Sequence, residues 1–273
     1  MRPEELRALP RPLAFVLPGG GALGGYQVGV LRALAEAGVE PDLIVGVSAG
    51  AVNAALRAWN PGIDGIRHIE SLWRALRRRD LIRFHPGRLA LAVAGRRPSL
   101  LDNRHGRRWL LRNLGDQRIE NAPTRLVLVA TDLVTGEPVP LTRGKVIDSI
   151  LASSAFPAVY QPVEIDGRTL IDGGVTADVP LDLVAAHGAA SALVLQMPPL
   201  AHDAPPRRVI DILLRASTLG VEAHGRTVLR RPPTGLVVAE IDAAPSSVTT
   251  FSVDRASTVI DDGYRAASAW LDR

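Results

Sequence analysis

The sequence contains no cysteine, which excludes disulfide bonds, thiolate metal sites and cysteine nucleophiles. It also lacks any run close to the roughly 18 apolar residues that a membrane-spanning helix needs. Its first residues, MRPEELRALPRP, carry charge and proline where a signal peptide has an apolar stretch. We therefore expect a cytoplasmic chain with no signal peptide and no transmembrane segment, whose contact with any membrane is peripheral.

Lysine is almost absent as well, because Lys145 is the single lysine among 32 basic residues. A chain-wide preference for arginine therefore explains most of the scattered arginines. Their distribution is nonetheless uneven, since residues 67–118 contain 14 Arg and only 4 acidic residues. Such a positive segment attracts anionic surfaces and predicts peripheral contact with an anionic membrane surface. No nucleic-acid partner is expected, because aromatic residues make up only 4% of the chain and no stacking pattern accompanies the arginines.

Hydrophobic residues make up 47% of the 273 residues, as in ordinary globular proteins. Their spacing predicts strands at residues 13–17, 43–47, 125–130, 191–196 and 235–241, a hairpin of 161–165 with 169–171, and helices at 22–37, 49–59, 63–79, 146–155, 206–230 and 253–271. Strands that alternate with helices imply an α/β fold with a mostly parallel central sheet flanked by helices. We expect a single domain over residues 1–273, with an irregular Arg-rich insertion at about 60–120.

The stretch GVSAG, residues 46–50, is the first candidate functional motif. It lies between an expected strand and an expected helix, where a G-x-S-x-G turn presents its serine outward as a nucleophile. Chance gives about 0.1 such matches in a chain of this composition, so the motif is suggestive and its context adds weight. A serine that only caps the following helix would explain Ser48 but not the flanking Gly46 and Gly50. We therefore predict that Ser48 is a nucleophile.

A second cluster, PGGGALGG at residues 18–25, also separates an expected strand from an expected helix. Its G-x-G-x-x-G spacing is typical of dinucleotide sites, which need an acidic residue at the carboxyl end of the next strand. Asp42 stands at the start of that strand, and Ser48 stands at its end. Because parallel strands end at the same edge of a sheet, the N–H groups of residues 19–21 are predicted to face Ser48 and form an oxyanion hole.

The general base is not evident from the residues alone. Serine hydrolases of the α/β type use a histidine, but no histidine of this chain lies in a glycine-framed turn after an expected strand. The six are His68, His85, His105, His187, His202 and His224. Asp172 does occupy such a turn, before Gly173 and Gly174, although an ordinary turn aspartate is the favoured explanation for that position by itself.

Three elements together resemble those of the patatin-like phospholipases, which include bacterial relatives of neuropathy target esterase. They are GGGALGGYQVGVL at 19–31, GVSAG at 46–50 and IDGG at 171–174. The stretch ASSAFPAVYQPVEIDGRTLIDGGVTADVPL, residues 152–181, is similar to the family's pattern beyond these motifs, and the resemblance covers residues 13–197. It implies a patatin-like three-layer architecture and a Ser–Asp dyad that needs no histidine, no metal and no cofactor.

By motif match, the resemblance implies that Ser48 is the nucleophile and Asp172 the proton acceptor. It assigns Gly19, Gly20 and Gly21 to the oxyanion hole, and Gly24, Gly46, Gly50, Gly173 and Gly174 to the support of the motifs. The implied substrate is a lipid or another acyl ester, cleaved by phospholipase, lysophospholipase or lipid esterase activity. The reaction is acylation of Ser48, loss of the alcohol, and hydrolysis by a water molecule that Asp172 activates.

Two alternatives remain open from the sequence. An acyltransferase would form the same acyl-enzyme and differ only in its acceptor. A non-catalytic lipid-binding protein of the same fold is the other, although the intact Ser48 and Asp172 argue against it. One departure from the family's pattern is Leu23, where many members carry Arg or Lys; it removes a positive charge near the site and leaves the amide donors unchanged.

Overall fold

A computed structural model describes residues 2–81, 96–199, 209–241, 243 and 253–272 of the chain. The strands within these residues are β1 (Leu13–Leu17), β2 (Leu43–Val47), β3 (Arg125–Asp132), β4 (Pro138–Leu141), β5 (Val163–Ile165), β6 (Arg168–Asp172), β7 (Ser191–Leu195) and β8 (Val237–Ile241). They form an eight-stranded sheet of order β5-β6-β3-β2-β1-β7-β8, with β4 paired to β3 outside this order. The pairs among β1, β2, β3, β7 and β8 are parallel, and those of β4, β5 and β6 are antiparallel. The predicted mostly parallel sheet is confirmed.

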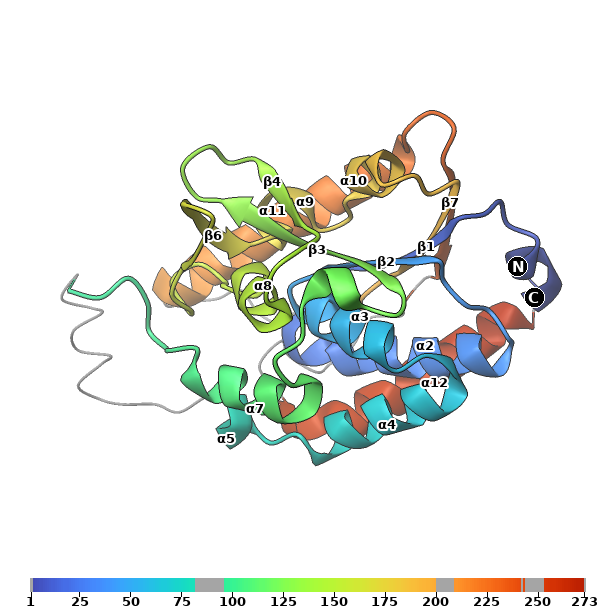
Figure 1. Cartoon of the computed structure of the whole chain (residues 1–273), viewed down its shortest axis with the longest axis horizontal. Helices are drawn as coiled ribbons and strands as arrows, with labels where there is room; N and C mark the ends of the chain where they lie inside the picture. Colours follow the sequence, from blue (N-terminus) through green and yellow to red (C-terminus); the bar gives the residue numbers. More distant parts are fainter. Residues whose placement is uncertain (1, 82–95, 200–208, 242, 244–252, 273) are drawn as a thin grey trace.

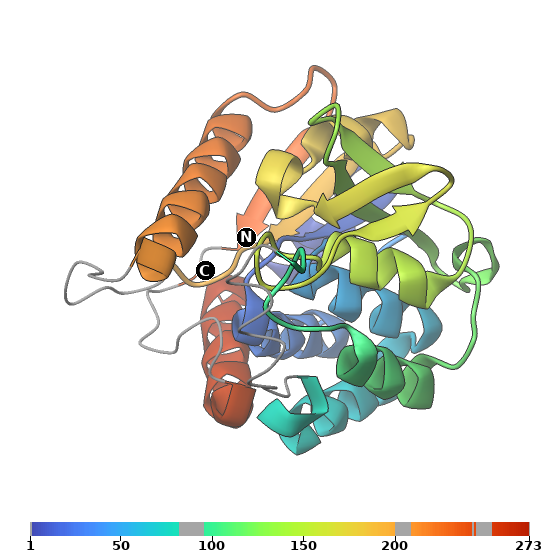
Figure 2. The ribbon, with the colours of Figure 1, turned by 90° about the vertical axis from the view of Figure 1, so that its left-hand side faces the viewer.

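Helices cover both faces of this sheet (Figures 1 and 2). They are α1 (Pro3–Arg7), α2 (Gly24–Glu36), α3 (Ala49–Trp59), α4 (Gly62–Ala75), α5 (Arg78–Leu81), α7 (Arg104–Leu114), α8 (Val146–Ser153), α9 (Gly174–Ala177), α10 (Leu181–Ala186), α11 (Val209–Arg230) and α12 (Ala256–Leu271), with short 3-10 turns η1 (Gly21–Leu23), η2 (Ile119–Asn121) and η3 (Val253–Arg255). Helices α2, α3, α4, α8 and α12 lie on one face, and α9, α10 and α11 lie on the other. The result is a helix–sheet–helix arrangement of three layers.

The side chains of β1 show why its sequence, LAFVL, is apolar throughout. Leu13, Phe15 and Leu17 pack into the core under α2 and α3. Ala14 and Val16 point to the opposite side, into the core under α10. Alternate residues of a strand face opposite sides of a sheet, so a strand covered by helices on both faces needs apolar side chains at every position.

Most of the predicted elements are confirmed, including the hairpin of β5 and β6. Its turn, Asp166-Gly167, has positive φ at both residues (50° and 76°), as a two-residue hairpin turn requires. The sequence did not indicate β4 or the short helices α1, α9 and α10, and the helix expected over 63–79 divides into α4 and α5. It also missed α7, an 11-residue helix in the segment that was expected to be irregular. Residues 206–208 of an expected helix lie outside the described residues. The single domain and its insertion at about 60–120 stay predictions; residues 82–95 of that segment also lie outside the described ones.

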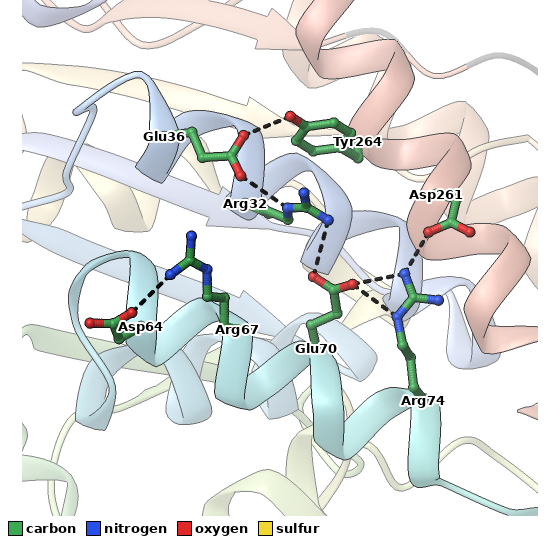
Figure 3. Close-up of polar contacts among 8 residues, drawn as sticks. All are labelled: Arg32, Glu36, Asp64, Arg67, Glu70, Arg74, Asp261 and Tyr264. Atoms are coloured by element: carbon green, nitrogen blue, oxygen red, sulfur yellow. Dashed lines mark hydrogen bonds and ion pairs between the residues drawn. The ribbon is translucent and has the colours of Figure 1, made fainter.

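Helix α12 crosses α2 with the two backbones in direct contact. A Cβ atom at Gly29 of α2 would collide with the carbonyl oxygen of Ile260, and one at Gly263 of α12 would collide with the carbonyl oxygen of Tyr26. The outer rim of this crossing carries polar contacts that also involve α4 (Figure 3). Helix α2, which directly follows the glycine cluster, is therefore fixed from both its inner and its outer side.

Candidate active site

Ser48 occupies the sharp turn between β2 and α3. Its backbone lies at φ 54° and ψ −119°, a region that residues other than glycine rarely adopt and that marks strained functional turns. The flanking glycines are required by packing, since a Cβ atom at Gly50 would collide with the carbonyl oxygen of Leu17. One at Gly46 would lie within 2.6 Å of Ala54. Helix α3 can therefore start directly behind the strand and hold the Ser48 hydroxyl at the edge of the sheet.

Two serines outside the predicted motifs hold the backbone of Ser48 in this conformation. The N–H of Ser48 donates to Ser153 Oγ at 2.9 Å, and Ser154 Oγ donates to the carbonyl oxygen of Ser48 at 3.1 Å. Ser153 Oγ in turn donates to the carbonyl oxygen of Val129 at 2.6 Å. Both polar groups of the strained residue are thus satisfied by the end of α8, which offsets the unfavourable backbone geometry.

Asp172 ends β6, which the antiparallel pairing with β3 brings to the same edge of the sheet. The hydroxyl of Ser48 donates to Asp172 Oδ2 at 2.6 Å, and the N–H of Gly174 donates to Asp172 Oδ1 at 2.9 Å. Asp172 is only 2% exposed, and this burial raises the pKa of its carboxyl to about 6, although the two hydrogen bonds oppose the shift. Its neighbour Gly173 has no room for a side chain, because a Cβ atom there would collide with the carbonyl oxygen of Val129.

The glycine cluster follows β1 and lies beside Ser48, because β1 and β2 are parallel neighbours. A Cβ atom at Gly19 would stand 3.1 Å from Cβ of Ser48. The N–H of Gly19 donates to Asp178 Oδ1 at 2.8 Å. Within the part of the chain that the structure describes, the N–H groups of Gly20 and Gly21 have no hydrogen-bond partner. The loop therefore offers two free amide donors next to the serine, and the third is occupied by a carboxyl.

A buried network of neutral side chains holds both ends of this loop. Gln27 Nε2 donates to the carbonyl oxygen of Pro18 at 3.0 Å, before the glycines. Asn53 Nδ2 donates to the carbonyl oxygen of Gly24 at 2.9 Å, after them, and also to Gln27 Oε1 at 3.0 Å. Trp73 Nε1 completes the set by donating to Asn53 Oδ1 at 2.9 Å. The loop is thereby tied to α3, the helix that begins at the serine.

An apolar cavity of about 540 Å³ opens beside these groups. Its walls include Trp73, Leu76, Trp109, Ile150, Phe156 and Val221. Ser48, Asp172 and Asp178 are among its polar lining residues, and none of the described histidines lines it. Among the residues with a described position, no three His, Asp or Glu side chains gather as a metal site would need. The arrangement can hold an apolar chain with its reacting carbonyl at the serine.

Ser48, Asp172 and the glycine loop, which the sequence singled out, lie together in the structure, and their catalytic roles stay predictions; the sequence did not indicate the residues that support them. Ser153 and Ser154 lie inside the stretch 152–181 that carried the resemblance, yet nothing in their spacing marked them as partners of Ser48. Gln27 and Asn53 left a readable signal, because each is a polar residue within an otherwise apolar helix face. Leu23, at the departure from the family's pattern, is 2% exposed and lines the cavity.

The family model of the patatin-like phospholipases matches residues 15–185, which is more than half of the chain. Uncharacterized NTE family proteins of Mycobacterium bovis and Mycobacterium tuberculosis are 34% identical to it over 175 residues, 63% of this chain and 45% of theirs. The lysophospholipase nte1 of Aspergillus terreus is 29% identical over 176 residues, 62% of this chain and 11% of that protein. The chain thus spans less than half the length of these curated relatives.

Among solved structures, VipD from Legionella pneumophila is similar with a TM-score of 0.48 and 16% identity, covering 96% of this chain and 67% of that one. The ExoU–SpcU complex from Pseudomonas aeruginosa gives 0.46 and 15% identity, with 97% and 52% covered. No helix within the described ranges is long and apolar enough to cross a membrane. From the extent of the family match, which includes all three motifs, the chain belongs to the patatin-like phospholipase family.

Proposed function

We propose that this protein is a serine acyl-ester hydrolase that acts on lipids, with Ser48 as nucleophile and Asp172 as general base. The observation that carries the proposal is the hydrogen bond of 2.6 Å from Ser48 Oγ to Asp172 Oδ2 at the edge of an apolar cavity. A nucleophile within hydrogen-bond reach of its base is the signature of covalent catalysis.

In the acylation step, Asp172 takes the proton of Ser48 as its oxygen attacks the ester carbonyl. The free N–H groups of Gly20 and Gly21 then stabilise the negative oxygen of the tetrahedral intermediate, and each such donor lowers the barrier by about 3 kcal/mol. The intermediate collapses when Asp172 returns the proton to the leaving alcohol. In the second step, the same carboxylate takes a proton from a water molecule as the water oxygen attacks the carbonyl of the acyl-enzyme. Asp172 then returns this proton to the Ser48 oxygen as the carboxylic acid leaves.

The raised pKa of Asp172 suits this role, because a carboxylate with its ordinary pKa is a weak base for a serine hydroxyl. The base must be ionised to work. Since burial raises its pKa to about 6, kcat/KM should fall as the pH drops below that value. A pH profile of turnover measures this acid limb directly.

The substrate class rests on the cavity and on the family. The cavity walls are apolar, as binding of an acyl chain requires, and an Aspergillus relative is named a lysophospholipase. We therefore propose a lipid ester as substrate, without assigning a head group.

Peripheral contact with an anionic membrane is the second part of the proposal. Among the described arginines of the segment 67–118, several are already paired: Arg67 with Asp64, Arg74 with Glu70, Arg107 with Asp148, and Arg118 with Glu120. Affinity for anionic over neutral vesicles, lost at high salt, tests this contact.

The catalytic test compares wild type with Ser48→Ala and Asp172→Asn on p-nitrophenyl esters of increasing chain length and on lysophospholipids. Each variant should lose at least about 10³-fold in kcat/KM, as removal of a member of a catalytic triad does. Ser71→Ala, an exposed helix serine, is the matched control and should keep full turnover. Wild type should be labelled at Ser48 by a fluorophosphonate probe. Turnover that survives Ser48→Ala would rule out the proposed nucleophile.

Acyl transfer is separated from hydrolysis by the products. With glycerol or a lysolipid added as acceptor, a hydrolase releases free acid in constant yield. A transferase shifts the acyl group to the acceptor at the same total rate of Ser48 acylation.

A further inference from the structure

A second carboxyl group lies in the site and has no part in the dyad. Asp178 follows α9, is half-buried and lines the cavity. Its Oδ1 accepts the N–H of Gly19 at 2.8 Å. A Cβ atom placed on Gly174 would lie 3.2 Å from Asp172 Oδ1 and 3.3 Å from Asp178 Oδ1, so the two carboxyls flank the same glycine.

We propose that Asp178 is a positioning residue of the oxyanion loop: it holds the Gly19 peptide through its acceptor oxygen, and the acyl-enzyme chemistry proceeds while its carboxyl is neutral. This inference rests on the function proposed above. It deepens that function by adding a residue and a charge requirement that the Ser48–Asp172 dyad alone does not supply.

The positioning part follows from where the Gly19 peptide lies. A Cβ atom at Gly19 would be 3.0 Å from Asp178 Oδ1 and 3.1 Å from Cβ of Ser48, so this residue is enclosed between the carboxyl and the nucleophile. The N–H of Gly19 is committed to Asp178, while Gly20 and Gly21, whose N–H groups have no partner in the described structure, line the same cavity as Ser48. Without the acceptor, the Gly19 N–H loses its only described partner and the loop loses its anchor on this side.

The charge requirement follows from electrostatics. The tetrahedral intermediate places a negative oxygen at the glycine loop, and a carboxylate bound to the same loop would oppose that charge in a water-poor cavity. A neutral carboxyl keeps the acceptor oxygen for Gly19 and removes the repulsion. Asp178 therefore needs the opposite protonation state from Asp172.

The surroundings of Asp178 favour its neutral form. Burial is the largest cause that raises the pKa of Asp178, to about 7, and the nearby negative charges of Asp172 on β6 and Glu222 on α11 add to it, against the hydrogen bond from Gly19. The cations on α11, Arg215 and Arg226, pair with Glu222 at 3.4 and 3.9 Å. In the described structure Asp178 has no ion-pair partner. Because the charge of Asp172 raises the pKa of Asp178, an ionised Asp172 favours the neutral form of Asp178.

The test measures kcat and KM for a soluble p-nitrophenyl ester from about pH 5 to 9 in wild type, Asp178→Asn and Asp178→Ala. Asparagine keeps an acceptor for Gly19 but cannot ionise. The ratio of kcat/KM between Asp178→Asn and wild type should therefore rise above about pH 7, by up to about tenfold per pH unit. Alanine removes the acceptor and should lower kcat about 10-fold or more across the range, with KM nearly unchanged. Asp182→Asn, an exposed acid on α10, is the charge-matched control and should follow wild type.

Parallel pH profiles of Asp178→Asn and wild type would overturn the inference, as would a folded Asp178→Ala variant with wild-type kcat. Circular dichroism and thermal melting establish folding, and the Asp178→Asn profile decides the charge requirement even if the alanine variant misfolds. The two proposals fail differently. If wild-type turnover does not depend on Ser48, the proposed function itself is wrong; if it does and the profiles are parallel, only the role of Asp178 is wrong.

Discussion

Two polar networks hold helix α2, and they differ in charge and in exposure. The inner network consists of neutral side chains, Gln27, Asn53 and Trp73, and both amide residues are 0% exposed. The outer network joins α2, α4 and α12 through charged groups (Figure 3). Its members are Arg32, Glu36, Glu70, Arg74, Asp261 and Tyr264.

The two networks are expected to contribute very differently to the molecule. A buried donor that loses its partner costs its full desolvation penalty, about 1–3 kcal/mol per group. An exposed ion pair contributes at most about 1 kcal/mol and is screened by salt. The side chain of Asp261, for example, is 58% exposed in its pair with Arg74. The comparison teaches that the glycine loop is held by buried groups that water cannot replace, whereas the outer polar contacts only add to the close packing that already holds α12 against α2.

Asp172 belongs to neither network, but it combines the burial of the inner network with the charge of the outer one. Its folded-state pKa, about 6, lies above the ordinary 3.8, so ionisation destabilises the fold. The cost appears as the pH rises from about 4 to about 6 and persists above that. Asp172→Asn should therefore abolish turnover, yet be more stable than wild type at pH 8 by about 3 kcal/mol, with no difference below about pH 4. Urea unfolding at pH 4, 6 and 8 measures it, and a variant less stable than wild type at pH 8 would contradict the prediction.

Asn53 is expected to affect turnover less than Asp172 but to have the largest effect on the free energy of unfolding. Asn53→Ala leaves the Trp73 indole N–H, the Gly24 carbonyl and the Gln27 amide oxygen short of a partner and should cost about 3–4 kcal/mol of unfolding free energy. The loop then loses its tie to α3, so kcat should fall as well. The control is Asn113→Ala, because half-buried Asn113 only donates to the carbonyl oxygen of Trp109 four residues earlier. That variant should cost less than about 1 kcal/mol. Equal costs at both positions would break the comparison.

The close crossing of α2 and α12 tests how much backbone packing, rather than polar contacts, holds α2. Gly29→Ala places a methyl group against the carbonyl oxygen of Ile260 and should destabilise the fold by about 2–3 kcal/mol. A Cβ atom added to Gly106 of α7 would meet only open space. Gly106→Ala should therefore raise the free energy of unfolding by about 0.5–1 kcal/mol, because alanine has the higher helix propensity. Thermal melting of the two single variants gives shifts of opposite sign. A Gly29→Ala protein that melts at or above the wild-type temperature would show that the helices separate easily.

Glu70 should show the smallest effect, although it contacts both Arg32 and Arg74. Glu70→Gln is expected to cost about 0.5–1 kcal/mol at low salt, and the difference from wild type should shrink when NaCl is raised from about 0.05 to 0.5 M. Asp64→Asn removes a pair whose acidic side chain is 91% exposed and should change nothing measurable. A cost at Glu70 that is independent of salt would place it with the buried network instead.

The elements of the fold that the sequence predicted are those whose cause is local. The central strands are apolar at most positions and the apolar residues of the helices repeat every three to four residues, so β1, β2, β3, β7 and the helices after them could be located. Gly38, directly after the helix expected over 22–37, has a positive φ of 69°, as is common for a glycine that ends a helix. Strand β4 escaped prediction because PVPL contains two prolines, which are unusual inside a strand.

The candidate site divides in the same way. The local motif predicted Ser48 as nucleophile and explained its flanking glycines, while the proposed role of Asp172 came only from the family resemblance. The contacts of Ser153, Asn53 and Asp178 join positions far apart in the chain, up to 159 residues for Asp178 and Gly19. A hydrogen bond of that kind depends on the sheet order, which no short stretch of sequence specifies.

Strand β7 and helix α12 lie beyond residue 185, where the match to the family model ends. A fragment cut at that position would keep every motif but expose the edge of β1 that β7 covers, and open strand edges recruit other chains into aggregates. Anyone who excises this unit, fuses it or grafts it into another protein should therefore extend it to Leu271, the last residue of α12. The family match ends at residue 185, whereas the sheet and the helices packed on it continue to Leu271.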